Sequence, residues 1–324
     1  MHRILTIDGG GLKGTIPAAF LAALEDHIER PLHEYFDLIV GTSTGGIIAA
    51  GLAMGMKARD VLAIYERDGP RIFPTTTWWT SSVLWCKGWI RTKYPISVLR
   101  DKLTETFGAT RIGDARTRLV IPSWDPQAQT VHVWKTRHCG RFHIDHKKRV
   151  VEALVSTASA PTYFASSTND GGTGLIDGGV WANNPMSIAA VEALGVLRWE
   201  PASVRMLALG CVKEDFIAPA TGGQLRWAPI AAKLLLQAQS KSSLTSACLL
   251  LGDRGNPSHR IFRIEASAPA GHFKLDSSRE IPVMKTLGQN LARQHIDQLR
   301  PVFFTSPAAP FVPLPDDADE TAIA

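Results

Sequence analysis

The feature of this sequence that most constrains its fold is a unit that occurs twice near the start: an apolar strand, a glycine turn and a helix. The first unit has a β-forming stretch from Arg3 to Ile7, then three glycines, then helical periodicity from Lys13 to Ile28. The second has an apolar stretch from Phe36 to Val40 and a small-residue helix from Ser43 to Met54. Successive units of this kind are typical of parallel strands covered by helices. We therefore predict an α/β fold with a central, mostly parallel sheet flanked by helices.

The rest of the chain fits one large domain. At 324 residues and 45% hydrophobic composition it has enough apolar side chains for a substantial core. Further strands are expected at Leu119–Pro122, Val131–Lys135, Val204–Leu209 and Arg260–Ile264, and further helices at Val150–Ser159, Pro185–Leu197, Ile230–Leu251 and Pro282–Leu299. We expect the domain to span residues 1–305. Residues 306–324 are rich in Pro, Ala and Asp, which predicts a disordered tail.

Residues 70–95 break the alternation of strands and helices, and we interpret them as an excursion or lid. Four tryptophans, Trp78, Trp79, Trp85 and Trp89, stand among Arg71, Lys87, Arg91 and Lys93. Indoles favour a membrane interface and cations favour anionic lipid, so this segment could meet a membrane, or its rings could stack on nucleotide bases. The alternative is a small satellite core under a long loop.

Composition excludes several classes of protein. The net charge of +5 is mild and no nucleic-acid motif accompanies it, so a nucleic-acid polymer is not an expected partner. The four cysteines, Cys86, Cys139, Cys211 and Cys248, show neither a disulfide framework nor a zinc spacing. The start of the chain is too short an apolar stretch for a signal peptide. We expect an intracellular protein with reduced thiols.

The uncharged stretch from Leu38 to Met56 is long enough to cross a bilayer. Its five glycines and its hydroxyl side chains lower its hydrophobicity, however. A strand, a sharp turn and a buried helix fit this stretch better than a membrane span.

The strongest local signal is Ser43, within the sequence GTSTG at residues 41–45. This fits G-x-S-x-G between an apolar strand and a helix, the pattern of a nucleophile elbow. Gly41 and Gly45 are required because side chains would clash in so tight a turn. The helix N-terminus behind Ser43 favours developing negative charge. A plain glycine turn capped by Ser43 or Thr44 is the alternative.

The run DGGGLKG at residues 8–14 predicts a backbone anion site. Consecutive glycines leave their N–H groups unhindered, so the loop suits an oxyanion hole. Gly9, Gly11 and Gly14 also satisfy the G-x-G-x-x-G pattern of a dinucleotide-binding turn. Such a site requires an acidic residue at the end of the next strand to hold the ribose, but this chain has Gly41 and the elbow there.

Asp177 is the third candidate, because it follows the apolar pair Leu175 and Ile176 and precedes Gly178 and Gly179. An acid at a strand end, followed by two glycines, is well placed to face a site. Its carboxylate would act as general base toward Ser43. The alternative is a turn aspartate that bonds its own backbone.

Together these three segments resemble the patatin-like phospholipase family, which is marked by a G-G-G-x-[K/R]-G loop, a G-x-S-x-G elbow and a D-G-[A/G] motif in that order. The stretch Ala158–Phe164 also resembles the family's segment before its catalytic aspartate. The resemblance covers about Arg3 to Pro185. Within the family, the sequences of the first two motifs are similar to those of plant patatins and of bacterial anti-phage patatins that cyclic dinucleotides activate.

The resemblance implies a three-layer patatin-like sandwich and a Ser-Asp dyad without histidine, with Ser43 as nucleophile and Asp177 as base. It implies an oxyanion hole formed by Gly9, Gly10, Gly11 and Leu12. It gives supporting positions to Lys13, Gly14, Gly41, Gly45, Gly178 and Gly179. It implies neither a metal nor a cofactor.

The implied function is hydrolysis of fatty-acyl esters of membrane phospholipids, as a phospholipase A or lysophospholipase. The narrower likeness adds activation by a cyclic dinucleotide in anti-phage defence, with nucleotide binding and a homo-oligomer as further expectations. A phospholipid surface is the implied partner, which places the protein in the cytoplasm, peripheral at the inner membrane face.

A constitutive lipid acyl hydrolase, active without a nucleotide, is one alternative. Two other classes of protein also remain as alternatives. An α/β-hydrolase esterase with a Ser-His-Asp triad would place His259, His272 or His295 after Ser43 and Asp177 in the order of that fold. Its elbow normally comes deeper in the fold, and none of these histidines sits in a glycine-flanked turn. A non-catalytic binding module is disfavoured because every dyad position is filled.

Overall fold

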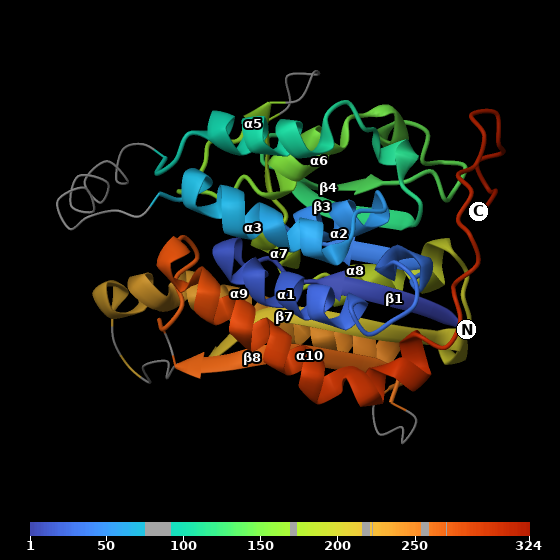
Figure 1. Cartoon of the computed structure of the whole chain (residues 1–324). Coiled ribbons are helices and arrows are strands. Elements are labelled where there is room, and N and C mark those ends of the chain that lie inside the picture. Colours follow the sequence, from blue (N-terminus) through green and yellow to red (C-terminus); the bar gives the residue numbers. More distant parts are fainter. Residues whose placement is uncertain (75–91, 169–173, 216–220, 222, 254–258, 270) are drawn as a thin grey trace.

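Strands from the whole length of the chain meet in one central sheet (Figure 1). The computed structural model describes residues 1–74, 92–168, 174–215, 221, 223–253, 259–269 and 271–324. Within these ranges the strands are β1 (His2–Ile7), β2 (Leu38–Gly41), β3 (Arg118–Asp125), β4 (Thr130–Lys135), β5 (Ser167–Thr168), β6 (Gly174–Asp177), β7 (Val204–Asp215) and β8 (Ile261–Pro269). Their order in the sheet is β5-β6-β3-β2-β1-β7-β8, and β4 pairs with β3.

The middle of this sheet is parallel. The neighbours from β3 through β2, β1 and β7 to β8 all run in the same direction. On the β3 side, β4 and β6 pair antiparallel with β3, and β5 pairs antiparallel with β6. The expected α/β fold with a mostly parallel sheet is confirmed.

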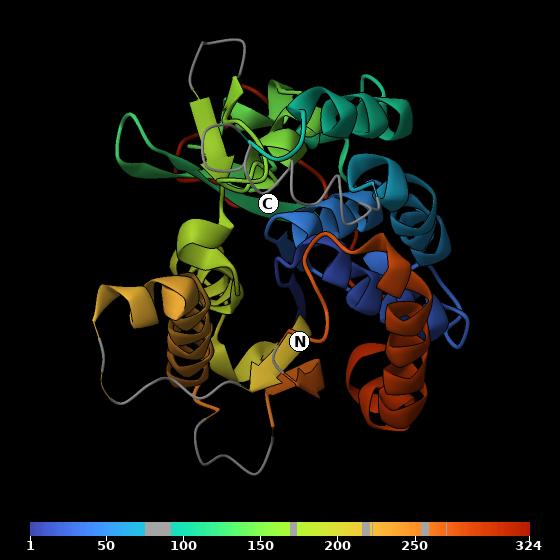
Figure 2. The same cartoon turned by 90° about the vertical axis from the view of Figure 1, so that its left-hand side faces the viewer.

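Helices cover both faces of the sheet, as Figure 2 shows with α1 and α10 on one side and α8 and α9 on the other. The helices are α1 (Thr15–Glu25), α2 (Thr44–Ala53), α3 (Ala58–Ile72), α5 (Ile96–Phe107), α6 (Val150–Thr157), α7 (Gly179–Ala182), α8 (Met186–Val191), α9 (Gln224–Leu250) and α10 (Ile281–Phe303). A short π-helix, Glu192–Val196, continues α8. Leu5 and Ile7 of β1 pack into one core and Ile4 into the other. This alternation produces three layers, because successive side chains of a strand point to opposite faces.

Two helices, α3 and α5, were not among the sequence-based expectations. In α3 the residues Val61, Leu62 and Tyr65 are buried, on a helix whose other side is charged. The two helices pack near each other. In the sequence, α3 precedes residues 75–91 and α5 follows them. The tryptophans of the expected lid, residues 78–89, lie outside the described residues.

Residues 306–324 differ from the expected disordered tail. They run along the side of the molecule where β1 begins, drawn in red in Figure 1. The buried guanidinium of Arg137 donates to the carbonyl oxygens of Pro315 and Asp316, both at 3.0 Å. The amide of Ala308 donates to the carbonyl of Glu34 at 2.7 Å. These hydrogen bonds to its main chain tie the tail to the domain.

The uncharged stretch 38–56 forms β2 and α2, as expected, and not a membrane span. Among the helices of the described ranges, none combines the length and apolar character that crossing a membrane requires.

Candidate active site

Ser43 sits at the carboxyl end of β2, immediately before α2. Its backbone has φ 54° and ψ −126°, a strained conformation for a residue with a side chain. The strain comes from a turn in which neighbouring backbones almost touch. A Cβ atom on Gly41 would lie 2.2 Å from the carbonyl oxygen of Gly45, and one on Gly45 would lie 2.4 Å from that of Ile7. Only glycine fits at both positions, as the sequence predicted.

Asp177 reaches Ser43 from a distant part of the chain. It ends β6, which pairs antiparallel with β3 through Ser123 and Asp177. The hydroxyl of Ser43 donates to Oδ2 of Asp177 at 2.6 Å. The amide of Gly179 donates to Oδ1 of Asp177, also at 2.6 Å. The carboxylate is thus held from both sides, with one oxygen on the serine.

The pair is buried, with Ser43 8% and Asp177 5% exposed. Burial raises the pKa of Asp177 to about 7, although the hydrogen bonds from Ser43 and Gly179 oppose this change. Within the described ranges, no cation opposes the effect of burial on this pKa. A carboxylate with a pKa close to the working pH is suited to act as a general base.

Thr157, at the end of α6, fixes the elbow in place and was not singled out from the sequence. The amide of Ser43 donates to Oγ1 of Thr157 at 3.0 Å. The Thr157 hydroxyl in turn donates to the carbonyl oxygen of Pro122 at 2.5 Å. The sequence signal that could have indicated Thr157 was its position, directly before the Ala158–Phe164 segment that resembles the family.

The glycine loop lies beside Ser43, and a Cβ atom on Gly9 would be 3.1 Å from Cβ of Ser43. Two of the four expected oxyanion donors already have partners. The amide of Gly9 donates to the carbonyl of Asn183 at 3.0 Å, and that of Leu12 donates to the carbonyl of Leu275 at 2.8 Å.

The other two amides of the loop are the more available ones. The amide of Gly10 makes a long hydrogen bond of 3.3 Å to Oγ1 of Thr44. The amide of Gly11 has no acceptor among the described residues. The amides of Gly10 and Gly11 are therefore the loop donors that are freest to bind another acceptor.

The supporting positions of the loop and of the aspartate motif are tightly packed. Lys13 forms an ion pair with Glu214. A Cβ atom on Gly14 would lie 2.8 Å from the ring of Tyr65, and one on Gly178 would lie 2.2 Å from the carbonyl of Pro122. These positions shape the backbone of the site and do not face Ser43.

A buried ion pair anchors the start of the glycine loop, and sequence reasoning missed it. The guanidinium of Arg263 on β8 reaches across β7 to both carboxylate oxygens of Asp8. Nothing in the local sequence around Arg263 indicates this partner, because the sheet order alone brings the two together.

The histidines of the alternative triad do not join the dyad. None of His259, His272 and His295 is hydrogen-bonded to Ser43 or Asp177 in the described part of the chain. A search of the same residues for clusters of His, Cys, Asp and Glu able to hold a metal ion finds none.

Comparison with known proteins identifies the family. The model of the family described as patatin-like phospholipase matches residues 5–190. The chain belongs to the patatin-like phospholipase family. The matched region of this patatin-like protein contains the glycine loop, the elbow and the aspartate motif, in that order along the chain.

Bacterial relatives of this patatin-like protein carry the name cGAMP-activated phospholipase. The one from Pseudomonas aeruginosa is 36% identical over 64% of this chain and 62% of its own length. The one from Escherichia coli is 34% identical over 69% and 66%. The one from Vibrio cholerae is 26% identical over 95% and 96%. The chain thus spans about two thirds of the first two relatives.

Plant proteins and solved structures also match. Patatin-like protein 1 of Oryza sativa is 34% identical over 58% of this chain and 50% of its own length. The crystal structure of VipD from Legionella pneumophila aligns with 92% of this chain and 67% of that chain, at 12% identity and a TM-score of 0.47.

Proposed function

We propose that this chain is a serine acyl hydrolase that cleaves fatty-acyl esters of phospholipids with a dyad of Ser43 and Asp177. The observation that carries the proposal is the 2.6 Å hydrogen bond from the Ser43 hydroxyl to Oδ2 of Asp177. Membership of the patatin-like phospholipase family supports the substrate class.

The first half of the reaction is acyl transfer to the enzyme. Ser43 Oγ attacks the ester carbonyl carbon while Asp177 accepts the hydroxyl proton. The tetrahedral oxyanion is held by the amides of Gly10 and Gly11, with the N-terminus of α2 behind it. The ester C–O bond then breaks, and Asp177 returns the proton to the leaving alcohol, which departs as a lysolipid or glycerol compound.

The second half releases the fatty acid. Asp177, again ionised, accepts a proton from a water molecule that attacks the acyl-enzyme carbonyl. The same two amides hold the second oxyanion. The Ser43–acyl bond breaks, Ser43 regains its proton from Asp177, and a free fatty acid leaves.

Mass spectrometry of the products from mixed phospholipid vesicles tests this function. We expect free fatty acids and lysolipids with the unaltered chain, and none above background with Ser43→Ala. His259→Ala serves as the matched control, because it removes a histidine of the rival triad. Loss of hydrolysis in His259→Ala would favour the triad, and hydrolysis by Ser43→Ala would end the proposal.

Regulation by a cyclic dinucleotide is the second part of the proposal, supported by the names of three bacterial relatives that are called cGAMP-activated. We infer that cGAMP or a similar nucleotide increases hydrolysis by this chain, at a phospholipid surface on the inner membrane face, as part of anti-phage defence and with assembly into a homo-oligomer. Hydrolysis and molecular mass are measured with and without cGAMP. Identical values in both conditions would reject this part while leaving the hydrolase intact.

A further inference from the structure

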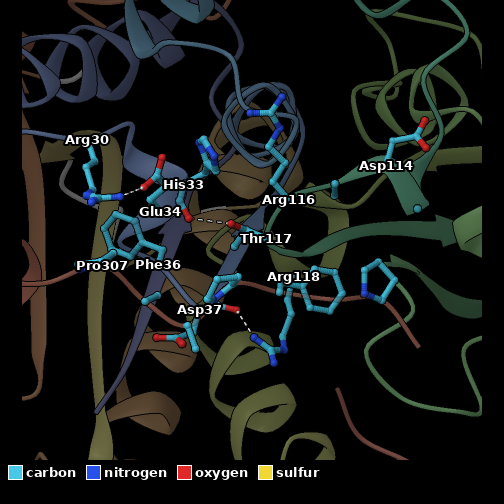
Figure 3. A pocket seen from close by; sticks show the side chains of 17 residues that line it. Arg30, His33, Glu34, Phe36, Asp37, Asp114, Arg116, Thr117, Arg118 and Pro307 are labelled. Atoms are coloured by element: carbon cyan, nitrogen blue, oxygen red, sulfur yellow. Dashed lines mark hydrogen bonds and ion pairs between the residues drawn. The ribbon is translucent and has the colours of Figure 1, made fainter. Parts of the chain in front are cut away.

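A cavity of about 590 Å³ lies where β2 and β3 begin (Figure 3). Ser43 follows the other end of β2. Pockets for small ligands typically measure about 300–1,000 Å³. Its walls come from three distant segments: residues 30–37 before β2, residues 113–118 at the start of β3, and residues 307–313 of the tail. The tail thus closes a space that the domain alone would leave as an open groove.

Basic side chains and carboxylates share the lining. Arg30, Arg116, Arg118 and His33 all line the cavity. The guanidinium of Arg116 has no hydrogen-bond or ion-pair partner within the described ranges, and it packs against Gly55. An arginine with free donors in a concave site is suited to bind phosphate oxygens.

His33 adds a second, independent sign of a missing ligand. Its side chain is 92% buried, because only 8% of its surface is exposed. Its Nδ1 atom is buried and has no hydrogen-bond partner among the described residues. Buried polar atoms are nearly always paired, so an orphaned one in a cavity wall indicates a group that binds there.

The acidic side chains of the cavity are already engaged. Glu34 pairs with Arg30 at 3.0 Å. Asp37 accepts the amide of Arg3 at 2.8 Å, and Asp114 accepts the amide of Arg111 at 2.7 Å. The carboxylates therefore satisfy the protein's own donors, whereas the unpartnered groups, Arg116 and His33, are the ones suited to an anion.

A flat aromatic surface completes the site. The guanidinium of Arg118 lies over the ring of Phe311, with its Cζ 5.0 Å from the ring centroid. Arg118 also donates to the main-chain oxygens of Asp37 and Ala324. Planar guanidinium and aromatic groups are the usual stacking partners of nucleobases.

We propose that this cavity binds a cyclic dinucleotide, with Arg116 and His33 on a phosphate and a base against Arg118 and Phe311. The proposal rests on the regulatory part of the proposed function and names the place where the nucleotide acts. That place is remote from the dyad, since Asp37 and Ser43 stand at opposite ends of β2. At about 3.3 Å per residue, the six steps between them span about 20 Å.

The test is isothermal titration calorimetry of the full chain with cGAMP. Arg116→Ala removes the unpartnered guanidinium without breaking a hydrogen bond or ion pair among the described residues, and we expect it to weaken binding about tenfold to a hundredfold. Arg293→Ala is the matched control, because this exposed arginine on α10 lies outside the cavity and donates a hydrogen bond to Oδ1 of Asn290. Phe311→Ala should also weaken binding, and Ser43→Ala should leave it unchanged.

Several outcomes would overturn the proposal: no heat of binding with cGAMP, equal affinity in Arg116→Ala and the unaltered chain, or equal losses in Arg116→Ala and Arg293→Ala. Inorganic phosphate and anionic vesicles serve as further probes. Arg116-dependent binding of vesicles without binding of cGAMP would make the cavity a headgroup site. Product formation without nucleotide is measured on the same samples, so the proposal that Ser43 hydrolyses lipid esters is tested independently of nucleotide binding.

Discussion

At the scale of single residues, Asp177 is a carboxylate without a cationic partner in the described part of the chain. It is held by one hydroxyl and one amide, and burial raises its pKa to about 7. A neighbouring arginine would have kept it ionised over a wider range, and would have made it a weaker base. The absence of a cation at this point is thus what suits Asp177 to accept a proton.

A pH profile of hydrolysis checks this reasoning. Because Asp177 must be ionised to accept the Ser43 proton, kcat/KM should fall about tenfold per pH unit below about 7 and level off above about 8. The raised pKa therefore gives activity that increases with pH through this range. A profile that is flat from pH 5 to 8, or that declines as pH rises, would contradict the role of Asp177.

Thr157 offers a second test at this scale. Thr157→Val keeps the shape of the side chain but removes its hydrogen bonds to Ser43 and Pro122. We expect the free energy of unfolding to fall by about 1–3 kcal/mol. We expect kcat to fall by about 10²-fold because the nucleophile shifts. Thr157→Ser retains the hydroxyl and should stay close to the unaltered chain in both measurements. Equal effects of the two substitutions would show that the hydroxyl does not position Ser43.

The sequence predicted residues of the site only where a short local pattern carries them. Ser43 and Asp177 lie in such patterns, and the structure brings them together. Thr157 and Arg263 carry no such pattern, because their partners depend on which strands become neighbours. Gly9 and Leu12 were expected as oxyanion donors, but their amides are taken by carbonyls of Asn183 and Leu275, from segments far away in the sequence.

At the scale of elements, the glycine loop packs against the segment around Leu275, whose carbonyl accepts a hydrogen bond from the amide of Leu12. Gly11 has φ +58°, and a Cβ atom there would lie 2.4 Å from the carbonyl oxygen of Leu275. Its substitution would therefore disturb the loop in two ways, through backbone strain and through this contact.

A matched pair of substitutions separates these two effects. Gly108 has nearly the same backbone, with φ +55°, but a Cβ atom there meets nothing within 4 Å. Gly108→Ala should lower the free energy of unfolding by about 1–2 kcal/mol and leave hydrolysis unchanged. Gly11→Ala should add a loss of about 10²–10³ in kcat, measured on the same lipid. Equal kcat values in the two variants would show that the loop does not take part in the reaction.

Elements with a clear period or a flanking motif were predictable. β1, β2, α2 and α10 appear close to their expected limits. α3 and α5 flank the tryptophan-rich residues 70–95 and were not predicted, although α3 has an apolar stripe that is typical of a helix. The antiparallel pairing of β6 with β3, which delivers Asp177, is a long-range choice that local periodicity does not encode.

At the scale of the whole molecule, the tail is a structural part of the domain. Its composition predicts disorder, but its attachment depends on donors elsewhere, such as Arg137, that find main-chain carbonyls in it. Composition does not reveal such partners. The same holds for the cavity where β2 and β3 begin, whose walls come from three segments that are far apart in the sequence.

Deleting residues 306–324 should destabilise the protein. Arg137 is 2% exposed, and its guanidinium loses its two main-chain acceptors in the tail. We expect a loss of about 3 kcal/mol from these charged hydrogen bonds. For a chain of this length, this corresponds to a melting temperature lower by about 4 °C in a thermal melt followed by circular dichroism. An unchanged melting temperature would mean that the tail is dispensable for the fold.

The hydrogen bond between Ser43 and Asp177 joins residues 134 positions apart. Closing so long a loop costs entropy that local contacts do not repay, so this contact belongs to the slow, final stage of chain organisation. A nascent polypeptide that has emerged only as far as α6 carries the serine without its base. The hydrolase would thus be inert toward the cell's own lipids while it is still being synthesised, and would gain its reactivity only once the second half of the sheet has joined the first.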